Sequence, residues 1–109
     1  MAKNGRAEMG FVRVGRVEEV AVGEIREYEA AGKTIAVANV EGKVCAISNI
    51  CLHRGGPLGQ GELDGAMVTC PWHGWQFDVT NGKSCVDEAV GVETYAVEIR
   101  GDEIFVDAG

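Results

Sequence analysis

Apolar and polar residues alternate from Tyr95 to Arg100, which is the pattern of a strand with one buried face. A turn sequence at 100–102 follows, and the apolar run Ile104–Val106 returns along the chain. A second pair of apolar, β-branched runs covers Thr34–Val40 and Lys43–Ser48, with Glu41-Gly42 between them. A glycine turn that joins two such runs indicates a β-hairpin, so the pattern predicts two hairpins.

Shorter strands are predicted around 11–14 and 25–28, and residues 17–20 have the character of one helical turn. No longer stretch shows a helical period. Between the two hairpins, from about residue 49 to residue 82, the alternation breaks down into glycine-rich loops with brief strands near 67–69 and 76–79. The pattern therefore predicts an all-β protein, a single domain over residues 1–109, with a lobe at roughly 49–82 inserted into an antiparallel β base.

The inserted segment contains two short groups of potential metal ligands, Cys51 with His53 and Cys70 with His73. Cysteine thiolate is a soft ligand that suits iron and sulfide, and neutral imidazole is a borderline base, so two of each favour a [2Fe-2S] cluster with unequal irons. A zinc site of two cysteines and two histidines is the alternative. Zinc modules usually place two to four residues between paired ligands, and the single residue between Cys51 and His53 is too few for that.

The stretches 51–58 (CLHRGGPL) and 70–78 (CPWHGWQFD) resemble the two cluster loops of Rieske-type ferredoxins, the electron carriers of bacterial aromatic-ring dioxygenases. The resemblance implies a Rieske fold with an antiparallel sheet base and an inserted cluster-binding lobe. It also implies that Cys51 and Cys70 bind one iron of a single [2Fe-2S] cluster, and that His53 and His73 bind the other. The implied function is one-electron transfer from a flavin-dependent NAD(P)H reductase to a terminal oxygenase, through the imidazole edges.

Several features of the quinol-oxidising Rieske proteins are missing from this sequence. Their disulfide brace corresponds here to Gly56 and Trp72, and their serine and tyrosine donors to the cluster sulfurs correspond to Trp75 and Phe77. Fewer donors leave the negative charge of the reduced cluster less stabilised, so we expect a reduction potential near the low end of the Rieske range, roughly −150 mV. Trp75 and Phe77 are expected to pack in the core, and the role of Trp72 is left open.

Charge and length narrow the class of protein further. Ten basic and seventeen acidic residues give a net charge of −7, which argues against nucleic-acid binding and suits a basic protein partner. No apolar run is long enough for a signal peptide or a membrane span, so a cytoplasmic protein is expected, and a diffusing carrier is expected to be monomeric. The chain has only two histidines, too few for the additional mononuclear iron site of a Rieske oxygenase, so we expect an electron-transfer component and not an enzyme.

The remaining predictions concern the surface and the surplus thiols. Cys45 is expected to be a small buried hydrophobe, and Cys85, in the third loop near the cluster, is also expected to be buried. The predicted docking surface has an apolar centre and an acidic rim, formed by Leu52, Pro57 and Leu58 and by Glu62, Asp64, Asp87 and Glu88. Two alternative functions stay open, namely the small Rieske-like subunit of an assimilatory nitrite reductase and a regulatory sensor.

Overall fold

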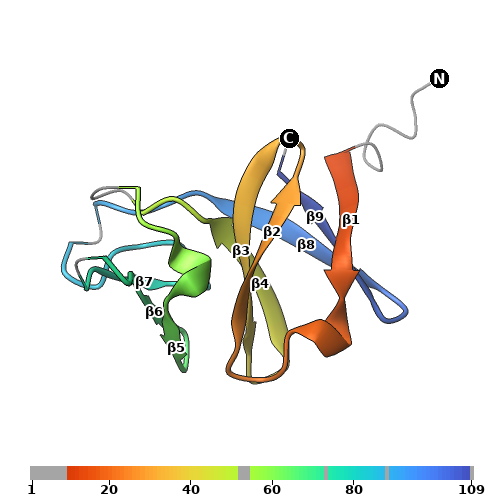
Figure 1. The fold of residues 1–109 in the computed structure, drawn as a ribbon, viewed down its shortest axis with the longest axis horizontal. Helices are drawn as coiled ribbons and strands as arrows, with labels where there is room; N and C mark the ends of the chain where they lie inside the picture. The colour runs from red at the N-terminus through yellow and green to blue at the C-terminus, as the bar shows by residue number, and fades with distance from the viewer. Residues whose placement is uncertain (1–9, 52–54, 73, 88, 109) are drawn as a thin grey trace.

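The computed structural model describes residues 10–51, 55–72, 74–87 and 89–108. In this part of the chain the strands form two antiparallel sheets, one of six strands and one of three (Figure 1). The six-stranded sheet has the order β1-β9-β8-β4-β3-β2. Its strands are β1 (Phe11–Arg16), β2 (Ile25–Ala30), β3 (Lys33–Val40), β4 (Lys43–Ser48), β8 (Thr94–Arg100) and β9 (Glu103–Asp107). Both predicted hairpins, the two earlier strands and the helical turn, η1 (Val17–Glu19), are confirmed.

The turn between β3 and β4 shows how the local sequence determines the register. Glu41 and Gly42 both have positive φ, 54° and 97°, and Val40 pairs directly with Lys43. Two central residues with positive φ form the kind of two-residue turn whose twist matches that of the flanking strands. Glycine takes up this conformation without steric cost, which is why the predicted turn forms here.

Strand β3 is buried on both faces and separates two hydrophobic cores. Ile35 and Val37 point into the core between β3, β2 and the β8–β9 hairpin, whereas Ala36 and Ala38 point into the core beneath the inserted lobe. Side chains alternate between the faces of a strand, so one sequence run supplies both cores. The small alanines on the lobe side leave room for the lobe to approach the sheet closely.

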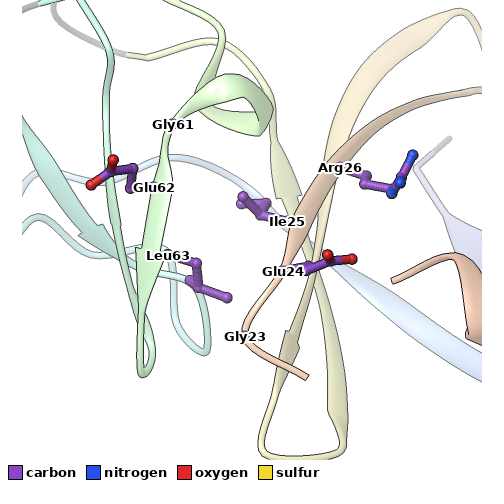
Figure 2. Close-up of a pocket in the computed structure, with 7 residues that line it drawn as sticks. All are labelled: Gly23, Glu24, Ile25, Arg26, Gly61, Glu62 and Leu63. Carbon is purple, nitrogen blue, oxygen red and sulfur yellow. The ribbon is translucent and has the colours of Figure 1, made fainter. Parts of the chain in front are cut away.

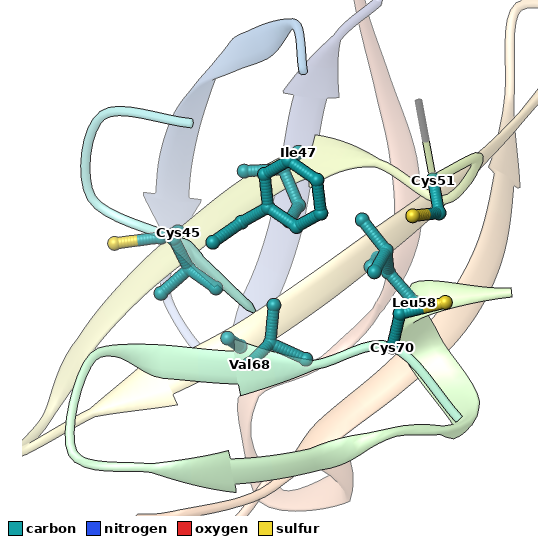
Figure 3. Close-up of a cluster of buried hydrophobic side chains, with 10 residues drawn as sticks. Cys45, Ile47, Cys51, Leu58, Val68 and Cys70 are labelled. Atoms are coloured by element: carbon teal, nitrogen blue, oxygen red, sulfur yellow. The ribbon is translucent and has the colours of Figure 1, made fainter. Parts of the chain in front are cut away.

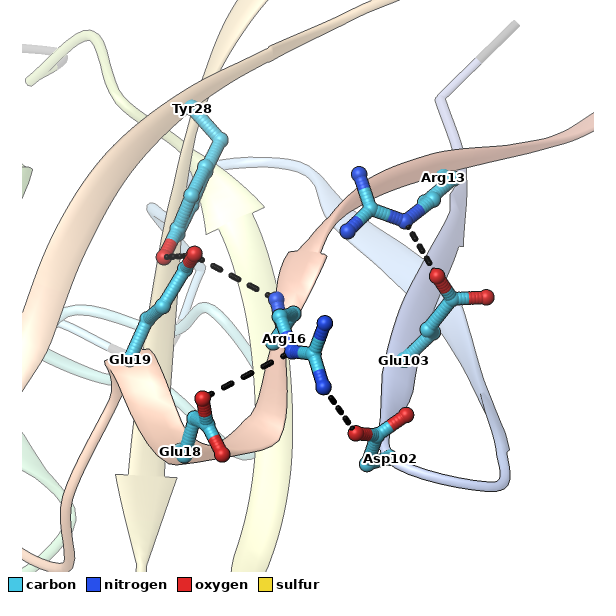
Figure 4. Close-up of polar contacts among 7 residues, drawn as sticks. All are labelled: Arg13, Arg16, Glu18, Glu19, Tyr28, Asp102 and Glu103. Carbon is cyan, nitrogen blue, oxygen red and sulfur yellow. Dashed lines mark hydrogen bonds and ion pairs between the residues drawn. The ribbon is translucent and has the colours of Figure 1, made fainter.

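Polar contacts at the surface join β1 to the β8–β9 hairpin and join η1 to β2 (Figure 4). Arg13 Nε donates to Glu103 at 2.7 Å, and the guanidinium of Arg16 pairs with Asp102. The Tyr28 hydroxyl on β2 donates at 2.9 Å to Glu19 Oε1 on η1, the turn that follows β1. Burial and the hydrogen bond to this carboxylate raise the pKa of Tyr28 to about 12, so the phenol keeps its proton and its donor role at neutral pH.

The inserted lobe occupies the chain between β4 and β8 and lies beside the six-stranded sheet (Figure 1). It contains η2 (Leu58–Gln60) and the three-stranded sheet β5 (Glu62–Asp64), β6 (Met67–Thr69) and β7 (Gln76–Asp78). The chain after β7 continues along the lobe, since Cys85 N donates to Gln76 O at 3.0 Å. No helix in the described ranges is both long and apolar enough to cross a membrane.

Candidate metal centre

The two predicted cysteine ligands belong to the same buried cluster of side chains beneath the lobe (Figure 3). Cys51 and Cys70 are only 2% and 3% exposed, and the fully buried Leu58 lies in the same cluster. The two thiols come from different loops, one after β4 and one after β6. The structure therefore brings together two predicted ligands that are 19 residues apart in the sequence, and it shields both from water.

The loop after Cys51 is closed by a pair of backbone hydrogen bonds. Cys51 N donates to Gly56 O at 2.9 Å, and Gly55 N donates to Cys51 O at 2.8 Å. Gly55 has a φ of 77°, in the left-handed region that glycine adopts most easily. The chain thus turns back directly behind the thiol.

The loop after Cys70 is closed in the same way. Cys70 N donates to Trp75 O at 2.7 Å, and Gly74 N donates to Cys70 O at 3.0 Å, with Gly74 at a φ of 78°. In each loop a glycine four residues after the cysteine closes the turn. The two loops therefore form the same kind of turn, and each turn presents one thiol. This arrangement suits a bound group that is held from two sides.

The described half of the donor set fits an iron–sulfur cluster. Two buried thiols in one apolar site are soft ligands with restricted access to water, as an iron–sulfur cluster requires. The imidazole donors, His53 and His73, lie outside the described residues, so their assignment as ligands stays a prediction.

Gly56 and Trp72, the positions that lack the disulfide brace, lie against each other. A Cβ atom on Gly56 would lie 3.0 Å from Trp72 Cγ and 2.7 Å from Cys70 Sγ. Trp72 itself is more than half exposed, whereas Phe77 is fully buried and Trp75 packs against the core. The predicted core packing of Trp75 and Phe77 is confirmed, with ring centroids 6.4 Å apart.

The predicted docking surface is wrong at Leu58. This side chain is fully buried, because η2 turns it inward between the two cysteine loops. Pro57 is half-buried, and the rim residues Glu62 and Asp87 are exposed. Asp64 is also exposed but pairs with Met67, at the end of the β5–β6 hairpin farther from Cys70. The other two surface residues, Leu52 and Glu88, lie outside the described residues.

The two surplus cysteines have different environments. Cys45 is buried on β4, as predicted, and burial raises the pKa of its thiol. Cys85 is exposed, so the expectation that it is buried is wrong, although partial desolvation raises the pKa of its thiol too. Its sulfur lies 3.0 Å from Met67 Sδ at the lobe surface. Neither thiol belongs to the turns that present Cys51 and Cys70.

A separate cleft of about 480 Å³ lies between the start of β2 and β5 (Figure 2). Its lining includes Arg26 from the base and Glu62 and Leu63 from the lobe. No thiol lines it. The cleft therefore marks a boundary between base and lobe that is distinct from the candidate metal centre.

Asn49 is a residue near the site that the sequence analysis missed. It is buried two residues before Cys51, and its side chain bonds to Glu27 on β2 and to Gly59 within η2. A polar residue directly after a buried strand is a weak signal of such a role. Its partners are ten and 22 residues away in the chain, so the contacts themselves could not be read from spacing.

Residues 10–96 match the family of the Rieske [2Fe-2S] domain, and the chain belongs to this family. This finding confirms the all-β Rieske fold and a [2Fe-2S] cluster as the cofactor, and it disfavours the zinc alternative.

Among its relatives are ferredoxin components of the naphthalene 1,2-dioxygenase system. The component from Pseudomonas aeruginosa is 32% identical over 90 residues, covering 82% of this chain and 86% of the relative. The one from Pseudomonas putida is 33% identical over 98 residues, covering 89% and 94%. The chain thus spans most of the length of these ferredoxins.

Solved structures point to the same class of protein. The ferredoxin of carbazole 1,9a-dioxygenase from Nocardioides aromaticivorans superposes with a TM-score of 0.84 at 28% identity, over 91% of this chain and 98% of that one. A chain of the complex of reduced oxygenase and oxidized ferredoxin in carbazole 1,9a-dioxygenase gives a TM-score of 0.81 at 28% identity, over 89% and 92%. The resemblance to Rieske-type ferredoxins is confirmed, and these relatives do not support the nitrite reductase alternative.

Proposed function

We propose that this protein is the one-electron carrier of an aromatic-ring-hydroxylating dioxygenase system. It accepts an electron from a flavin-dependent NAD(P)H reductase and delivers it to a terminal oxygenase. The observation that carries this proposal is the pair of matching turns that present two buried thiols, in a chain that covers most of the length of ferredoxin components. The protein would act as a cytoplasmic monomer that binds its two partners in turn.

The proposed ligands are the thiolates of Cys51 and Cys70 and the imidazoles of His53 and His73. When bound, a [2Fe-2S] cluster takes up and releases a single electron. The chain contributes two turns closed by backbone hydrogen bonds and an apolar enclosure around both sulfurs. With only two histidines, both assigned to the cluster, it has none left for a mononuclear iron site, so it supplies electrons and performs no bond-making chemistry.

The proposed docking surface surrounds the two cysteine loops. Ile50 and Trp72 are exposed beside them, and Val86 lines an apolar pocket together with Gly74 and Trp75. These exposed apolar side chains replace the buried Leu58 at the centre of the surface. Glu62 and Asp87 supply negative charge nearby, which suits a basic partner. Rising salt should therefore slow reduction by the reductase, and a stopped-flow rate indifferent to ionic strength would remove the acidic rim from the proposal.

The first experiment is EPR of the dithionite-reduced protein, purified without oxygen, with parallel assays of iron and acid-labile sulfide. A rhombic signal with an average g value below 2, with equal iron and sulfide, is expected for the wild type. The Cys51→Ser and Cys70→Ser variants should lose this signal, whereas Cys45→Ser and Cys85→Ser are matched controls that should retain it. Zinc without sulfide in the wild type, or a full signal in Cys51→Ser, would overturn the assignment.

A reconstituted chain of reductase, this protein and a Rieske oxygenase then tests the function itself. NADH oxidation coupled to product formation should require the wild-type protein and should fail with Cys51→Ser. Product formation at the same rate without the protein would show that it is not the carrier.

A further inference from the structure

Asn49 is a buried polar residue whose four hydrogen-bonding groups all have protein partners. It is 4% exposed, at the point where the chain leaves β4 for the first cysteine loop. Its backbone N donates to Thr34 O at 3.2 Å, and its backbone O accepts from Leu58 N at 2.8 Å. Its side chain accepts from Gly59 N at 2.6 Å and donates to Glu27 Oε2 at 2.7 Å. These bonds are costly to disturb, because a polar group left buried without a partner loses its solvation.

These contacts close the loop that contains Cys51. Asn49 precedes the loop, and Leu58 and Gly59 follow it, so one residue joins both ends of the segment 50–57. Ile50 and Pro57 form a β-bridge immediately inside this closure. The position of Cys51 relative to the base therefore depends on the hydrogen bonds of Asn49.

Glu27 connects this closure to the six-stranded sheet. One carboxylate oxygen accepts from Asn49 Nδ2, and the other accepts from Gln60 Nε2 at 3.1 Å. The packing is tight, because a Cβ on Gly59 would overlap the Glu27 side chain and lie 2.8 Å from Asn49 Oδ1. Hydrogen bonds to a charged acceptor are stronger than neutral ones. The carboxylate on β2 thus holds both the start and the end of the loop.

We propose that Asn49, together with Glu27, is a positioning residue that sets the placement of Cys51 against Cys70. The pair acts through the backbone of the first loop and binds no metal. The inference extends the function proposed above, since it takes Cys51 as a cluster ligand. If the hydrogen bonds of Asn49 were lost, the Cys51 sulfur would take up a range of positions. The bound cluster would then have a range of geometries from one molecule to the next.

An exchange of charge tests the proposal. Asn49→Asp removes the donor to Glu27 and sets two carboxylates against each other, while the new side chain still accepts from Gly59 N. Adding Glu27→Gln restores a hydrogen bond between the two positions, but position 27 is now the donor and position 49 the acceptor. The oxygen of the new amide still accepts from Gln60. The double variant also has the same net charge as the wild type.

Asn39→Asp is a matched control. Asn39 is 5% exposed, donates from Nδ2 to Val20 O at 2.9 Å and accepts from Gly42 N at 2.8 Å. It pairs with Val44, whereas the chain enters the cysteine loop from Ser48, at the other end of the β3–β4 ladder. Asn39→Asp also removes one buried side-chain donor, so it weakens the base to a comparable degree, but it leaves the closure of the cysteine loop intact.

Two kinds of readout, hydrogen exchange and the properties of the cluster, separate positioning from general stability. Asn49→Asp loses the bond from position 49 to Glu27, so the loop closure should open more often. Amide hydrogen exchange at Leu58 and Gly59 in the purified protein should then speed up roughly tenfold or more, the factor expected for loss of a hydrogen bond to a charged group. The reduced protein should show broadened EPR features and release iron to a chelator faster by a similar factor. The double variant should return to within a few-fold of the wild type, and Asn39→Asp should match the wild type in both readouts.

The proposal is overturned if Asn49→Asp behaves like Asn39→Asp, or if the double variant fails to recover. If Asn49→Asp takes up no cluster at all, recovery of the signal in the double variant still supports the proposal, and no recovery contradicts it. A wild type without a Rieske signal would overturn the proposed function, while hydrogen exchange would still decide whether Asn49 closes the loop.

Discussion

Replacing Gly56 by alanine should disturb the metal centre directly. The added Cβ would lie 2.7 Å from Cys70 Sγ and 3.0 Å from Trp72 Cγ. Non-bonded heavy atoms favour separations of about 3.5–4.0 Å, so the sulfur contact must lengthen by roughly 1 Å. Overpacking of this kind usually costs about 1–3 kcal/mol. Because the atom to be displaced belongs to Cys70, a proposed cluster ligand, we expect lower iron content per chain and shifted EPR features.

A glycine in the base provides the control. Gly101→Ala, in the turn between β8 and β9, places its Cβ within 4 Å of no other described residue, but it forces alanine to a φ of 65°. Left-handed backbone costs a non-glycine residue about 1–2 kcal/mol. The two variants should therefore lose similar stability in urea unfolding, so that stability alone does not separate them. Only Gly56→Ala should alter the spectrum of the cluster.

A second substitution identifies which contact matters. Trp72→Ala in the Gly56→Ala background removes the 3.0 Å contact with the ring and leaves the 2.7 Å contact with the sulfur. If the sulfur contact dominates, the double variant keeps the altered spectrum. Wild-type iron content and g values in Gly56→Ala would refute the reasoning, and full recovery in the double variant would assign the effect to the tryptophan ring.

Three further predictions follow from the surroundings of the site. The reduction potential should lie near roughly −150 mV, since Trp75 and Phe77 offer no hydroxyl to the cluster sulfurs, and a value above about +100 mV in a redox titration would contradict this. Leu58→Ala should lower the free energy of unfolding by about 2–5 kcal/mol in a denaturant titration, as for other buried leucines, and an unchanged midpoint would show that the side chain is not part of the core. Iodoacetamide at neutral pH should label Cys85 in the folded, cluster-loaded protein and reach Cys45 only on unfolding, which mass spectrometry of the peptides can check; equal labelling of both thiols would contradict the burial of Cys45.

The elements predicted with most success were those with a local cause. Alternation from Tyr95 to Arg100 and the turn at Glu41-Gly42 depend on neighbours in the chain, and both hairpins form where the pattern places them. The spacing of Cys51 and Cys70 with their histidines predicted the kind of cofactor for a similar reason, because ligand type and separation are properties of short segments. The buried placement of both thiols agrees with that prediction.

The errors fell where burial is decided by distant contacts. Leu58 lies in a loop without alternation, and it is buried because η2 packs against β2 and β3 of the base. Cys85 lies in another such loop, and it is exposed because the chain there lies along the edge of β7. The contact between Asn49 and Glu27 joins the start of the lobe to β2, and no local pattern encodes the relative placement of these two segments.

The lobe leaves the base and returns to it on neighbouring strands. Ala46 and Ile47 on β4 pair with Tyr95 and Thr94 on β8, and Ser48 N donates to Glu93 O at 2.9 Å. Residues 49–93 are therefore one long connection between two adjacent antiparallel strands of the base. The free-energy cost of closing such a loop grows by only about 0.6 kcal/mol for each doubling of its length. A short turn in place of this segment would connect the same two strands but would expose the face of β3 that Ala36 and Ala38 form beneath the lobe. The lobe is thus both a connection between β4 and β8 and the cover of one of the two cores.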